Sequence, residues 1–358
     1  MRAMFEVQSA AASYSVVSER NVIATHADAM RKGVVIVDEY FAPDLAAHGI
    51  PSIALHADEA AKSFDSLGAV IVRVRQSGAT RNSHIWAIGG GAIQDVAGFV
   101  ASIYMRGLSW TYAPTTLLGM VDSCIGGKSS INVGAYKNIV GTFHTPAAVL
   151  IDVALTDRLS IEQRVAGLVE AAKICYCRGA EVFAEYLRIE PHVGSSRANL
   201  EAVIELSLTA KKWFVEVDEF DHAERLLLNL GHTFGHALEG ASGYRLSHGV
   251  AVGVGILCAL ALSGEIFAGR PAGSAALLRG HMLGLLNSFP ELRERLRGVD
   301  PAEALERLQA DKKHEPDQYR FITFNPSGAV ALTRLPKTDD TRTKVIRALR
   351  GTLERLSA

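Results

Sequence analysis

The segment GHTFGHALE, residues 231–239, holds two histidines four residues apart, His232 and His236. A carboxylate and two imidazoles are a common ligand set for a catalytic zinc ion, with one coordination position left open. Glu170 and His248 are the other candidates for this set. Spacing alone makes His236 as good a ligand as His232. The sequence therefore predicts a divalent metal site and leaves the choice between these two histidines open.

Further polar residues surround these candidates. In RLLLNLGHTFGH the polar positions recur at about one helical turn and predict a single polar stripe: Arg225, Asn229, His232 and His236. Burying such a stripe among leucines is costly unless its members are paired or bind something. Lys173 follows Glu170 by three residues, which places both on one helix face. We include these side chains and Lys211 among the candidate site residues.

A second group of polar residues lies between positions 106 and 144. The segment is otherwise hydrophobic and glycine-rich, so its polar residues are not a solvated face: Arg106, Thr115, Thr116, Asp122, Lys128, Lys137, Asn138 and His144. In GGK, residues 126–128, backbone N–H groups and an ammonium could together bind a phosphate. The alternative is a loop with structural glycines.

The segment IWAIGGGAIQDVAGFVA, residues 85–101, predicts a strand, three glycines and a helix. Such a turn lets a diphosphate approach the free N–H groups and the positive dipole end of the helix. Asp95 then lies where a ligand would bind. The pattern is not GxGxxG, and a tight strand-to-helix turn without a ligand is the alternative.

The elements expected around these residues define an α/β fold. Three β-branched runs are expected strands: residues 33–40, 68–75 and 84–91. Their alternation with helical segments predicts a parallel sheet in a nucleotide-binding domain. The segments after residue 156 have helical spacing and are expected helices, apart from an expected hairpin at residues 321–335. We therefore expect an α/β domain over residues 1–156 and a mostly helical domain over residues 157–358, which ends in a charged amphipathic surface helix.

Composition indicates a soluble globular protein that is long enough for two domains, rather than a membrane or nucleic-acid-binding protein. The 358 residues carry a net charge of −1, and 48% are hydrophobic. We expect no signal peptide, and the most apolar run, residues 250–264, is shorter than the roughly 20 residues of a membrane span. The four cysteines form no CxxC pair and are expected as buried free thiols in a reducing cytoplasm: Cys124, Cys175, Cys177 and Cys258.

Taken together, these motifs resemble the dehydroquinate synthase family of sugar phosphate cyclases. The matching motifs are GGGAIQDVAGFVASIYMRG, PTTLLGMVDSCIGGKSSIN, KNIVGTFH, E-x-x-K at 170–173, and RLLLNLGHTFGHALE with HG at 248. The resemblance covers residues 35 to 335. It implies an α/β domain that binds NAD, a helical domain that binds a divalent metal, zinc or cobalt, and an active site in the cleft between the domains. It also implies a homodimer.

The resemblance assigns roles residue by residue. The implied metal ligands are Glu170, His232 and His248, so His236 would face the substrate. The implied phosphate ligands are Lys128, Asn138, His236, Lys312 or Lys313, and Arg106 across a dimer interface. The substrate carboxylate would be held by Lys211, Arg225 and Asn229, and its hydroxyls by Asp122 and Lys173. The implied NAD contacts are Gly90, Gly91, Asp95, Thr115, Thr116, Lys137, Glu59 and Lys62.

The activity implied is 3-dehydroquinate synthesis from a seven-carbon 2-keto acid phosphate, in which NAD takes up a hydride and returns it. Some positions depart from the family pattern: Asp58, GGKSS at 126–130, RLSIEQ at 158–163, Asp221 and Val250. Alternative substrates are therefore an aminated analogue or sedoheptulose 7-phosphate. A polyol dehydrogenase resembling glycerol dehydrogenase is the rival of a different reaction class, but it would need no phosphate site.

Overall fold

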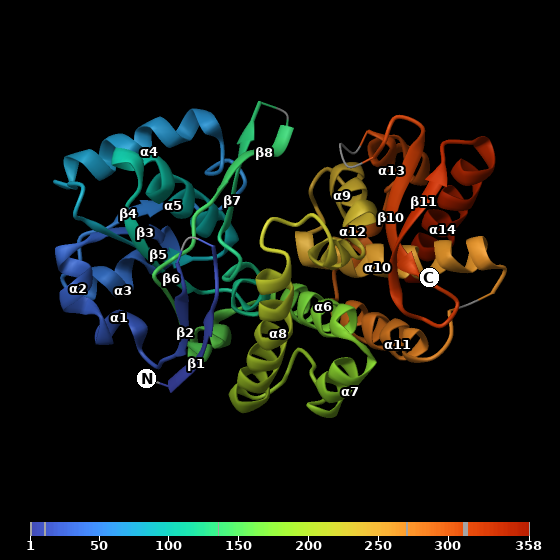
Figure 1. The fold of residues 1–358 in the computed structure, drawn as a ribbon, viewed down its shortest axis with the longest axis horizontal. Helices are drawn as coiled ribbons and strands as arrows, with labels where there is room; N and C mark the ends of the chain where they lie inside the picture. The colour runs from blue at the N-terminus through green and yellow to red at the C-terminus, as the bar shows by residue number, and fades with distance from the viewer. Residues whose placement is uncertain (1, 11, 135, 270, 311–313, 358) are drawn as a thin grey trace. The chain divides into compact units, whose positions relative to one another are not determined.

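The computed structural model describes residues 2–10, 12–134, 136–269, 271–310 and 314–357. Its internal contacts divide the chain into two units, Met1–Leu159 (unit 1) and Ser160–Ala358 (unit 2), shown in Figure 1. The division falls within a few residues of the boundary expected at 156. Each unit is described by itself below.

A seven-stranded sheet organises unit 1, with the strand order β1-β2-β9-β6-β5-β3-β4. The strands are β1 Arg2–Val7, β2 Tyr14–Ser18, β3 Val34–Asp38, β4 Ile53–Leu55, β5 His84–Gly89, β6 Ser109–Pro114 and β9 Ala148–Ile151. Only the β1–β2 pair is antiparallel among these described strands. The chain leaves β3 for β4 on one side and returns to β5 on the other side. The carboxyl ends of β3 and β5 therefore flank a topological switch point, where open α/β sheets bind ligands.

The helices of unit 1 connect these parallel strands. They are α1 Val22–Thr25, α2 Ala27–Lys32, α3 Ala42–Ala47, α4 Phe64–Gln76 and α5 Gly91–Ile103, with short 3-10 turns at Glu39–Phe41, Tyr104–Arg106 and Val153–Arg158. One apolar core contains Val35, Val37, Ile88 and Ala113 from the sheet, together with helix residues such as Met30. The predicted α/β architecture of this half is confirmed.

The prediction of a strand at residues 68–75 is wrong, because these residues lie in α4. Ser63 caps this helix by accepting a hydrogen bond from the backbone N–H of Asp65 at 3.1 Å. Leu67, Val70 and Val74 are its buried residues. Their spacing of three and four is helical, and burial on that face outweighs the strand preference of valine and isoleucine.

A separate two-stranded sheet extends from unit 1. It consists of β7 Lys128–Val133 and β8 Tyr136–Phe143, which pair antiparallel. Helix α5 packs against β7, so the hairpin is attached to the helix that follows β5. Gly126 and Gly127 precede it with φ of 103° and 65°, a conformation that favours glycine.

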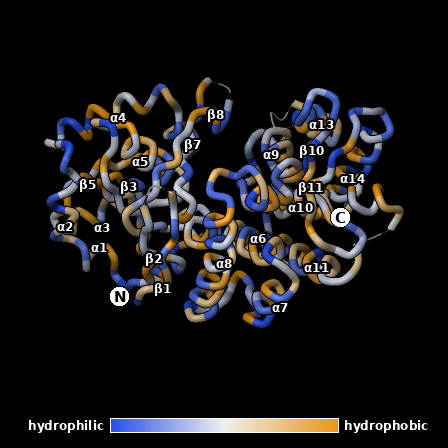
Figure 2. Tube along the Cα trace, viewed as in Figure 1, coloured by the Kyte–Doolittle hydropathy of each residue, from blue (hydrophilic) through white to orange (hydrophobic). Residues whose placement is uncertain are grey.

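Unit 2 is built from helices around α10. The helices are α6 Ile161–Arg178, α7 Ala180–Arg188, α8 Arg197–Val217, α9 His232–Ala241, α10 His248–Phe267, α11 Ser274–Asn287, α12 Leu292–Leu296, α13 Pro301–Gln309 and α14 Asp339–Ser357. Elements α6, α9, α11 and α14 pack on α10, as does strand β10 of a late hairpin. Figure 2 shows the hydrophobic residues along α10. This helix is apolar enough to span a membrane, but 72% of it is buried inside the protein, as expected for a core helix.

The late hairpin and the terminal helix are confirmed. Strands β10 Gln318–Phe324 and β11 Val330–Pro336 pair antiparallel, and α14 buries one face against α10. Three of the four cysteines are buried and Cys177 is partly buried, all without disulfides.

The predicted single helix through residues 225–236 is wrong. Residues Glu224–Asn229 form a 3-10 helix, and α9 begins only at His232. Gly231, with φ of 79°, lies between them. The polar residues of this segment therefore belong to two elements with different directions.

Glycines let α10 approach its neighbours closely. A Cβ atom added at Gly249 would lie 2.6 Å from Ala166 of α6. One at Gly255 would lie 2.1 Å from the carbonyl oxygen of Gly231 and 2.9 Å from the backbone nitrogen of Gly235. A side chain at either position would push α10 away from α6 or α9.

We predict that Gly255→Ala lowers the free energy of unfolding by about 3 kcal/mol, because overpacking against backbone cannot be relieved by a rotamer change. Gly280→Ala is the matched control in α11, where no described atom lies within 4 Å of the added Cβ. The control should raise stability by about 0.5–1 kcal/mol. Urea denaturation measures both, and equal effects of the two variants would contradict the close-approach argument.

A partly buried histidine gives unit 2 a pH-dependent stability. Nε2 of His281 lies 3.0 Å from the hydroxyl of Tyr186. Burial lowers the pKa of His281 from 6.5 to about 4. Between these values the unfolded chain binds more protons than the folded one. The stabilisation is therefore fully present above pH 6.5 and is lost as pH falls toward 4.

We expect His281→Gln to remove about 2 kcal/mol of the stability difference between pH 7 and pH 5. Denaturant unfolding of both proteins at the two pH values measures it. An unchanged pH dependence in the variant would show that His281 does not titrate in this range.

Candidate functional site

Three of the predicted metal ligands converge in unit 2. Glu170 lies in α6, His232 is the first residue of α9 and His248 is the first residue of α10. Nε2 of each histidine lies 3.9 Å from Oε1 of Glu170. Tetrahedral zinc with ligand bonds of about 2.1 Å would hold such atoms about 3.4 Å apart, so a small contraction would suffice.

The carboxylate of Glu170 is fully buried, and neither of its oxygens has a hydrogen-bond partner in the described structure. An ion pair with the ammonium of Lys173, which is 1% exposed, partly compensates for its burial. A buried carboxylate without hydrogen bonds is strongly destabilised. A cation among Glu170, His232 and His248 would remove this penalty, so the residues present fit a divalent metal.

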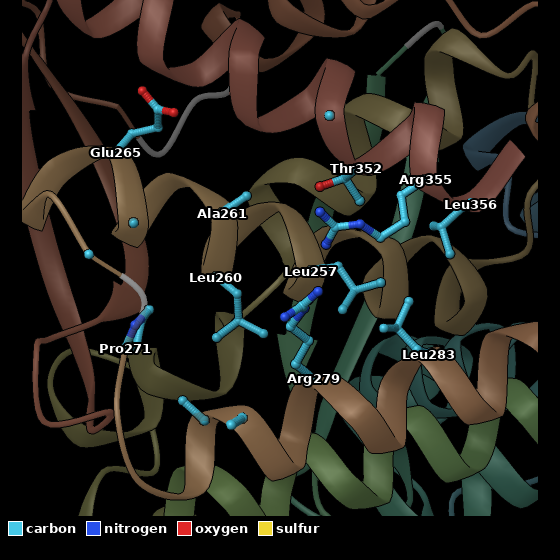
Figure 3. A pocket seen from close by; sticks show the side chains of 15 residues that line it. Leu257, Leu260, Ala261, Glu265, Pro271, Arg279, Leu283, Thr352, Arg355 and Leu356 are labelled. Carbon is cyan, nitrogen blue, oxygen red and sulfur yellow. The ribbon is translucent and has the colours of Figure 1, made fainter. Parts of the chain in front are cut away.

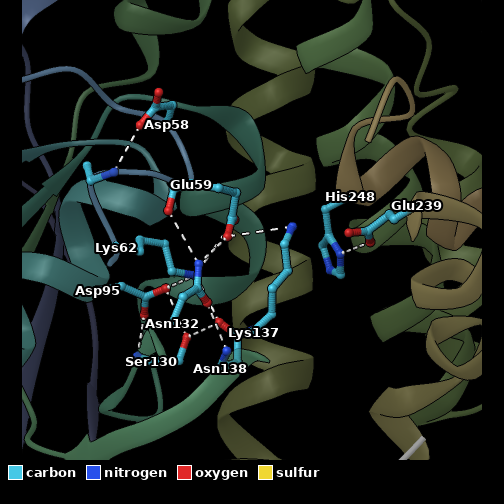
Figure 4. Close-up of polar contacts among 11 residues, drawn as sticks. Asp58, Glu59, Lys62, Asp95, Ser130, Asn132, Lys137, Asn138, Glu239 and His248 are labelled. Carbon is cyan, nitrogen blue, oxygen red and sulfur yellow. Dashed lines mark hydrogen bonds and ion pairs between the residues drawn. The ribbon is translucent and has the colours of Figure 1, made fainter. Parts of the chain in front are cut away.

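A second grouping, His236 with Glu239 and His248, also brings three ligand-type atoms together. The orientation of His248 favours the first grouping. Its Nδ1 lies 2.8 Å from Oε1 of Glu239, as Figure 4 shows, which directs Nε2 toward Glu170. A histidine ligand held by a carboxylate through its other nitrogen is the usual arrangement at metal sites. Exposed His236 is then left beside the site, with its ring 5.5 Å from that of His232.

The predicted carboxylate-binding residues lie in or near a turn held by Asp218. Its carboxylate accepts backbone hydrogen bonds from His222, Ala223 and Arg225 at 2.9, 2.7 and 3.1 Å. Burial would raise the pKa of Asp218, but these hydrogen bonds outweigh it and lower the pKa below its ordinary value. The carboxylate therefore stays charged and fixes the turn that carries Arg225.

Arg225 and Lys211 are both buried, at 4% and 6% exposed. The 3-10 helix that carries Arg225 and Asn229 packs against α6 and α8, and α8 carries Lys211. Arg225 donates to the carbonyl of Glu219, and the Asn229 amide donates to the carbonyl of Leu226. Two nearly buried cations on adjoining elements are consistent with an anion site.

The predicted cofactor turn of unit 1 lies at the carboxyl ends of β5 and β6. Gly89 pairs with Pro114 across these strands, and the N–H of Thr115 donates to the carbonyl of Gly89 at 3.0 Å. A Cβ at Gly90 would lie 3.0 Å from the Thr116 side chain. At Gly91, the first residue of α5, no described atom lies within 4 Å of an added Cβ. This open space at a helix N-terminus fits a diphosphate.

Four other predicted cofactor residues form one polar network, drawn in Figure 4. Nζ of Lys62 lies 2.7 Å from Asp95 and 3.8 Å from Glu59, and Lys137 lies 3.7 Å from Glu59. Burial raises the pKa of Asp95, and the Lys62 ammonium opposes that shift. Lys62 itself is 6% exposed. The network is therefore largely desolvated on the Lys62–Asp95 side.

The predicted phosphate-binding residues of unit 1 are presented on or near the hairpin. Lys128 and Asn138 are exposed on β7 and β8, and Asp122 is half-buried in a π-helical turn. Arg106 is exposed with φ of 73°. Lys312 and Lys313 lie outside the described residues.

Sequence reasoning missed three residues that organise these groups: Glu239, Ser130 and Asn132. Glu239 follows His236 by three residues, a spacing that could have flagged it. Ser130 donates from its backbone and side chain to Asp95 at 2.9 and 3.0 Å. The sequence motif GGKSSIN contains both Ser130 and Asn132, but only the strand register shows which way they point.

A cavity of unit 2 lies elsewhere. It has a volume of about 340 Å³ and is lined by α10, α11 and α14, including Leu257, Arg279, Leu283 and Arg355, as Figure 3 shows. It contains none of the predicted site residues. The metal-ligand cluster is thus identified by its chemistry and not by cavity size.

Several solved structures share the fold of this chain. One is 2-deoxy-scyllo-inosose synthase complexed with carbaglucose-6-phosphate, NAD+ and Co2+ (TM-score 0.84, 22% identity, 97% of this chain and 99% of that chain). Another is 2-epi-5-epi-valiolone synthase from Streptomyces hygroscopicus with NAD+ and Zn2+ bound (TM-score 0.77, 23% identity, 96% and 98%). A probable glycerol dehydrogenase from Sinorhizobium meliloti 1021 is less similar, with a TM-score of 0.63 and 16% identity over 94% of this chain and 96% of that chain.

The sequence comparisons are more specific. Curated 3-dehydroquinate synthases from Xanthomonas oryzae pv. oryzae (strain MAFF 311018) and Xylella fastidiosa (strain M23) are 37% and 38% identical, over 80% and 76% of this chain and 77% and 75% of theirs. Family models described as 3-dehydroquinate synthase N-terminal and C-terminal match residues 52–166 and 167–314. The chain therefore belongs to the 3-dehydroquinate synthase family.

Proposed function

We propose that this chain is a 3-dehydroquinate synthase, which converts 3-deoxy-D-arabino-heptulosonate 7-phosphate to 3-dehydroquinate and inorganic phosphate with NAD and a divalent metal. The observation that carries the proposal is the buried Glu170 carboxylate, ion-paired with Lys173 and with two imidazole nitrogens 3.9 Å away, in a chain of this family. Product and phosphate together account for every atom of the substrate, so the reaction has no net redox change.

The metal would be held by Glu170, His232 and His248. When bound, a zinc or cobalt ion supplies Lewis acidity toward substrate oxygens. Glu239 orients the imidazole of His248 and raises its basicity. Lys173 keeps a positive charge against Glu170 and limits the free energy cost of its burial.

For NAD, the proposed contacts are those of unit 1: Gly90, Gly91, Asp95, Thr115, Thr116, Lys137, Glu59 and Lys62. When bound, NAD supplies a hydride acceptor that is regenerated within the cycle. The N–H groups at the start of α5 would bind its diphosphate, since a side chain at Gly91 would occupy that space. The carboxylate of Glu59 would accept hydrogen bonds from ribose hydroxyls.

The substrate has an anion at each end, and the proposed residues match this. In unit 1, Lys128 and Asn138 would bind the phosphate. In unit 2, Lys211, Arg225 and Asn229 would bind the carboxylate, His236 the phosphate, and Lys173 a hydroxyl; Asp122 of unit 1 would bind another. Fixed charges at both ends hold one substrate conformer, which lowers the entropic part of the barrier.

Other sugar phosphate cyclases are the second candidate. Substrates such as sedoheptulose 7-phosphate lack the carboxylate that we assign to Lys211, Arg225 and Asn229. A polyol dehydrogenase would not use Lys128 and Asn138. The identity of the curated relatives favours the dehydroquinate reaction over both.

We also propose that the chain works as a homodimer in the cytoplasm. Arg106 is exposed, and it and Met105 have φ of 73° and 48°, a strained pair of left-handed residues. Such strain fits a side chain aimed at a partner subunit's phosphate site. Free cysteines throughout the described chain fit a reducing compartment.

The metal assignment predicts that Glu239→Gln weakens zinc binding by about 10- to 100-fold, because the charge that orients His248 is removed. Glu170→Gln, which alters a ligand, should weaken it further. Competition with a chromophoric chelator measures the affinity without any assay of turnover. Glu303→Gln, which removes a surface carboxylate paired with Arg307, is the control, and zinc affinity equal in all three variants would exclude this site.

The proposed reaction is tested by offering three substrates side by side with NAD and zinc: the heptulosonate 7-phosphate, its amino analogue and sedoheptulose 7-phosphate. Phosphate release should be fastest with the first, should stop when metal is chelated, and should return with zinc or cobalt. Lys128→Ala should reduce turnover at least 100-fold while NAD still binds. Faster release from either alternative substrate would replace the proposed activity with that one.

A further inference from the structure

Asn132 lies at the opposite end of β7 from Lys128. Both the nitrogen and the oxygen of its side-chain amide form hydrogen bonds. Its Nδ2 donates to the Glu59 carboxylate at 2.9 Å and to the Glu59 carbonyl at 3.3 Å. Its Oδ1 accepts from the backbone N–H of Asn138 at 2.9 Å. Reversing the amide would place an oxygen against two oxygens of Glu59 and a donor against the Asn138 donor, so only one orientation is satisfactory.

The backbone of Asn132 is fixed as well. Its N–H donates to the carbonyl of Lys62 at 2.8 Å, and the residue forms an isolated parallel bridge with Ser63. It is 9% exposed. Asn132 is thus the point where the hairpin joins the segment that carries Glu59 and Lys62, as Figure 4 shows.

The backbone conformation of Asn138 depends on its hydrogen bond to Asn132. Its φ is 52°, in the left-handed region, which asparagine tolerates but does not prefer. Such a conformation persists only where the surroundings hold it. The Asn132 amide holds its backbone, while Lys62 at 3.0 Å and Ser130 at 2.9 Å hold its side-chain oxygen.

We propose that Asn132 is a positioning residue that couples NAD binding at Glu59 to phosphate binding at Asn138. The inference rests on the proposed function, which assigns a ribose to Glu59 and the substrate phosphate to Asn138. Asn132 itself is assigned to neither ligand. A ribose that fixes the Glu59 carboxylate also fixes the amide bonded to it, and the amide fixes the backbone of Asn138.

The consequence is a shared ordering cost. Binding of the first ligand includes the conformational entropy cost of ordering Glu59, Asn132 and Asn138. The second ligand then binds to residues that are already ordered. NAD and phosphate should therefore bind cooperatively. The coupling must be reciprocal, because it is a difference of equilibrium free energies.

The experiment measures the dissociation constant of NAD by calorimetry with and without saturating inorganic phosphate. In the wild type we expect NAD to bind about five-fold more tightly when phosphate is present. Asn132→Ala should bring this ratio close to one. Asn132→Asp has the same shape and still accepts from the Asn138 N–H, but it cannot donate to Glu59, so it should also lose the coupling.

Ser129→Ala is the matched control. Ser129 is a neighbouring, buried residue of β7 whose hydroxyl bonds Thr142 across the hairpin at 2.8 Å, outside the path from Glu59 to Asn138. This variant should keep the wild-type ratio. Thermal melting identifies any variant that fails to fold, and if Asn132→Ala fails, the isosteric aspartate variant decides.

A ratio near one in the wild type, or full coupling in a folded Asn132→Asp variant, would overturn the proposal. Neither result depends on turnover. A protein that couples NAD to phosphate but does not convert the heptulosonate phosphate would refute the proposed activity and leave the coupling standing. A protein that makes dehydroquinate but binds NAD equally well with and without phosphate would refute the coupling and leave the proposed activity standing.

Discussion

The close approach of α10 to α6 and α9 is the constraint on which the metal-ligand cluster depends. Each ligand is tied to a point of glycine contact: His248 precedes Gly249, which touches Ala166 one turn before Glu170, and His232 follows Gly231, which touches Gly255. Side chains at these glycines would separate the helices by more than the small contraction that a metal requires. Helix packing, and not loop flexibility, therefore sets the distances among the three ligands.

The same packing explains how the protein tolerates a buried carboxylate. Removing Glu170 from water costs several kcal/mol unless a cation compensates. Lys173, from the next turn of the same helix, supplies one positive charge in the described structure. Glu170, His232 and His248 are thus already gathered in the described structure, and a divalent ion bound among them would add further compensation for the buried carboxylate. The site is built before the metal arrives, at the expense of some stability.

Much of this could be predicted from the sequence, because the chemistry lies in contiguous motifs. The α/β and helical halves, the glycine turn and Glu170 with Lys173 on one helix follow from periodicity and residue type. A strand was wrongly predicted at residues 68–75 because valine and isoleucine favour strands locally. Burial of Leu67, Val70 and Val74 on one face stabilises a helix there instead. Gly231 ended the expected polar stripe, since its left-handed φ breaks a helix that spacing alone would continue. Asn132 could not be found, because its role depends on contacts with Glu59, more than 70 residues away.

Three of the departures from the family pattern support the elements that carry the proposed ligands. Ser160 and Gln163, in the divergent run RLSIEQ, form a capping box that starts α6 and so fixes the helix carrying Glu170. Val250 is fully buried within α10, where a hydrophobic side chain strengthens the packing that holds His248. Ser130, from GGKSS, adds hydrogen bonds to Asp95 and Asn138. Substitutions that stabilise the support of a site, while its charged residues stay in place, change how firmly the site is held more than what it binds. On this reasoning the departures are compatible with the dehydroquinate reaction.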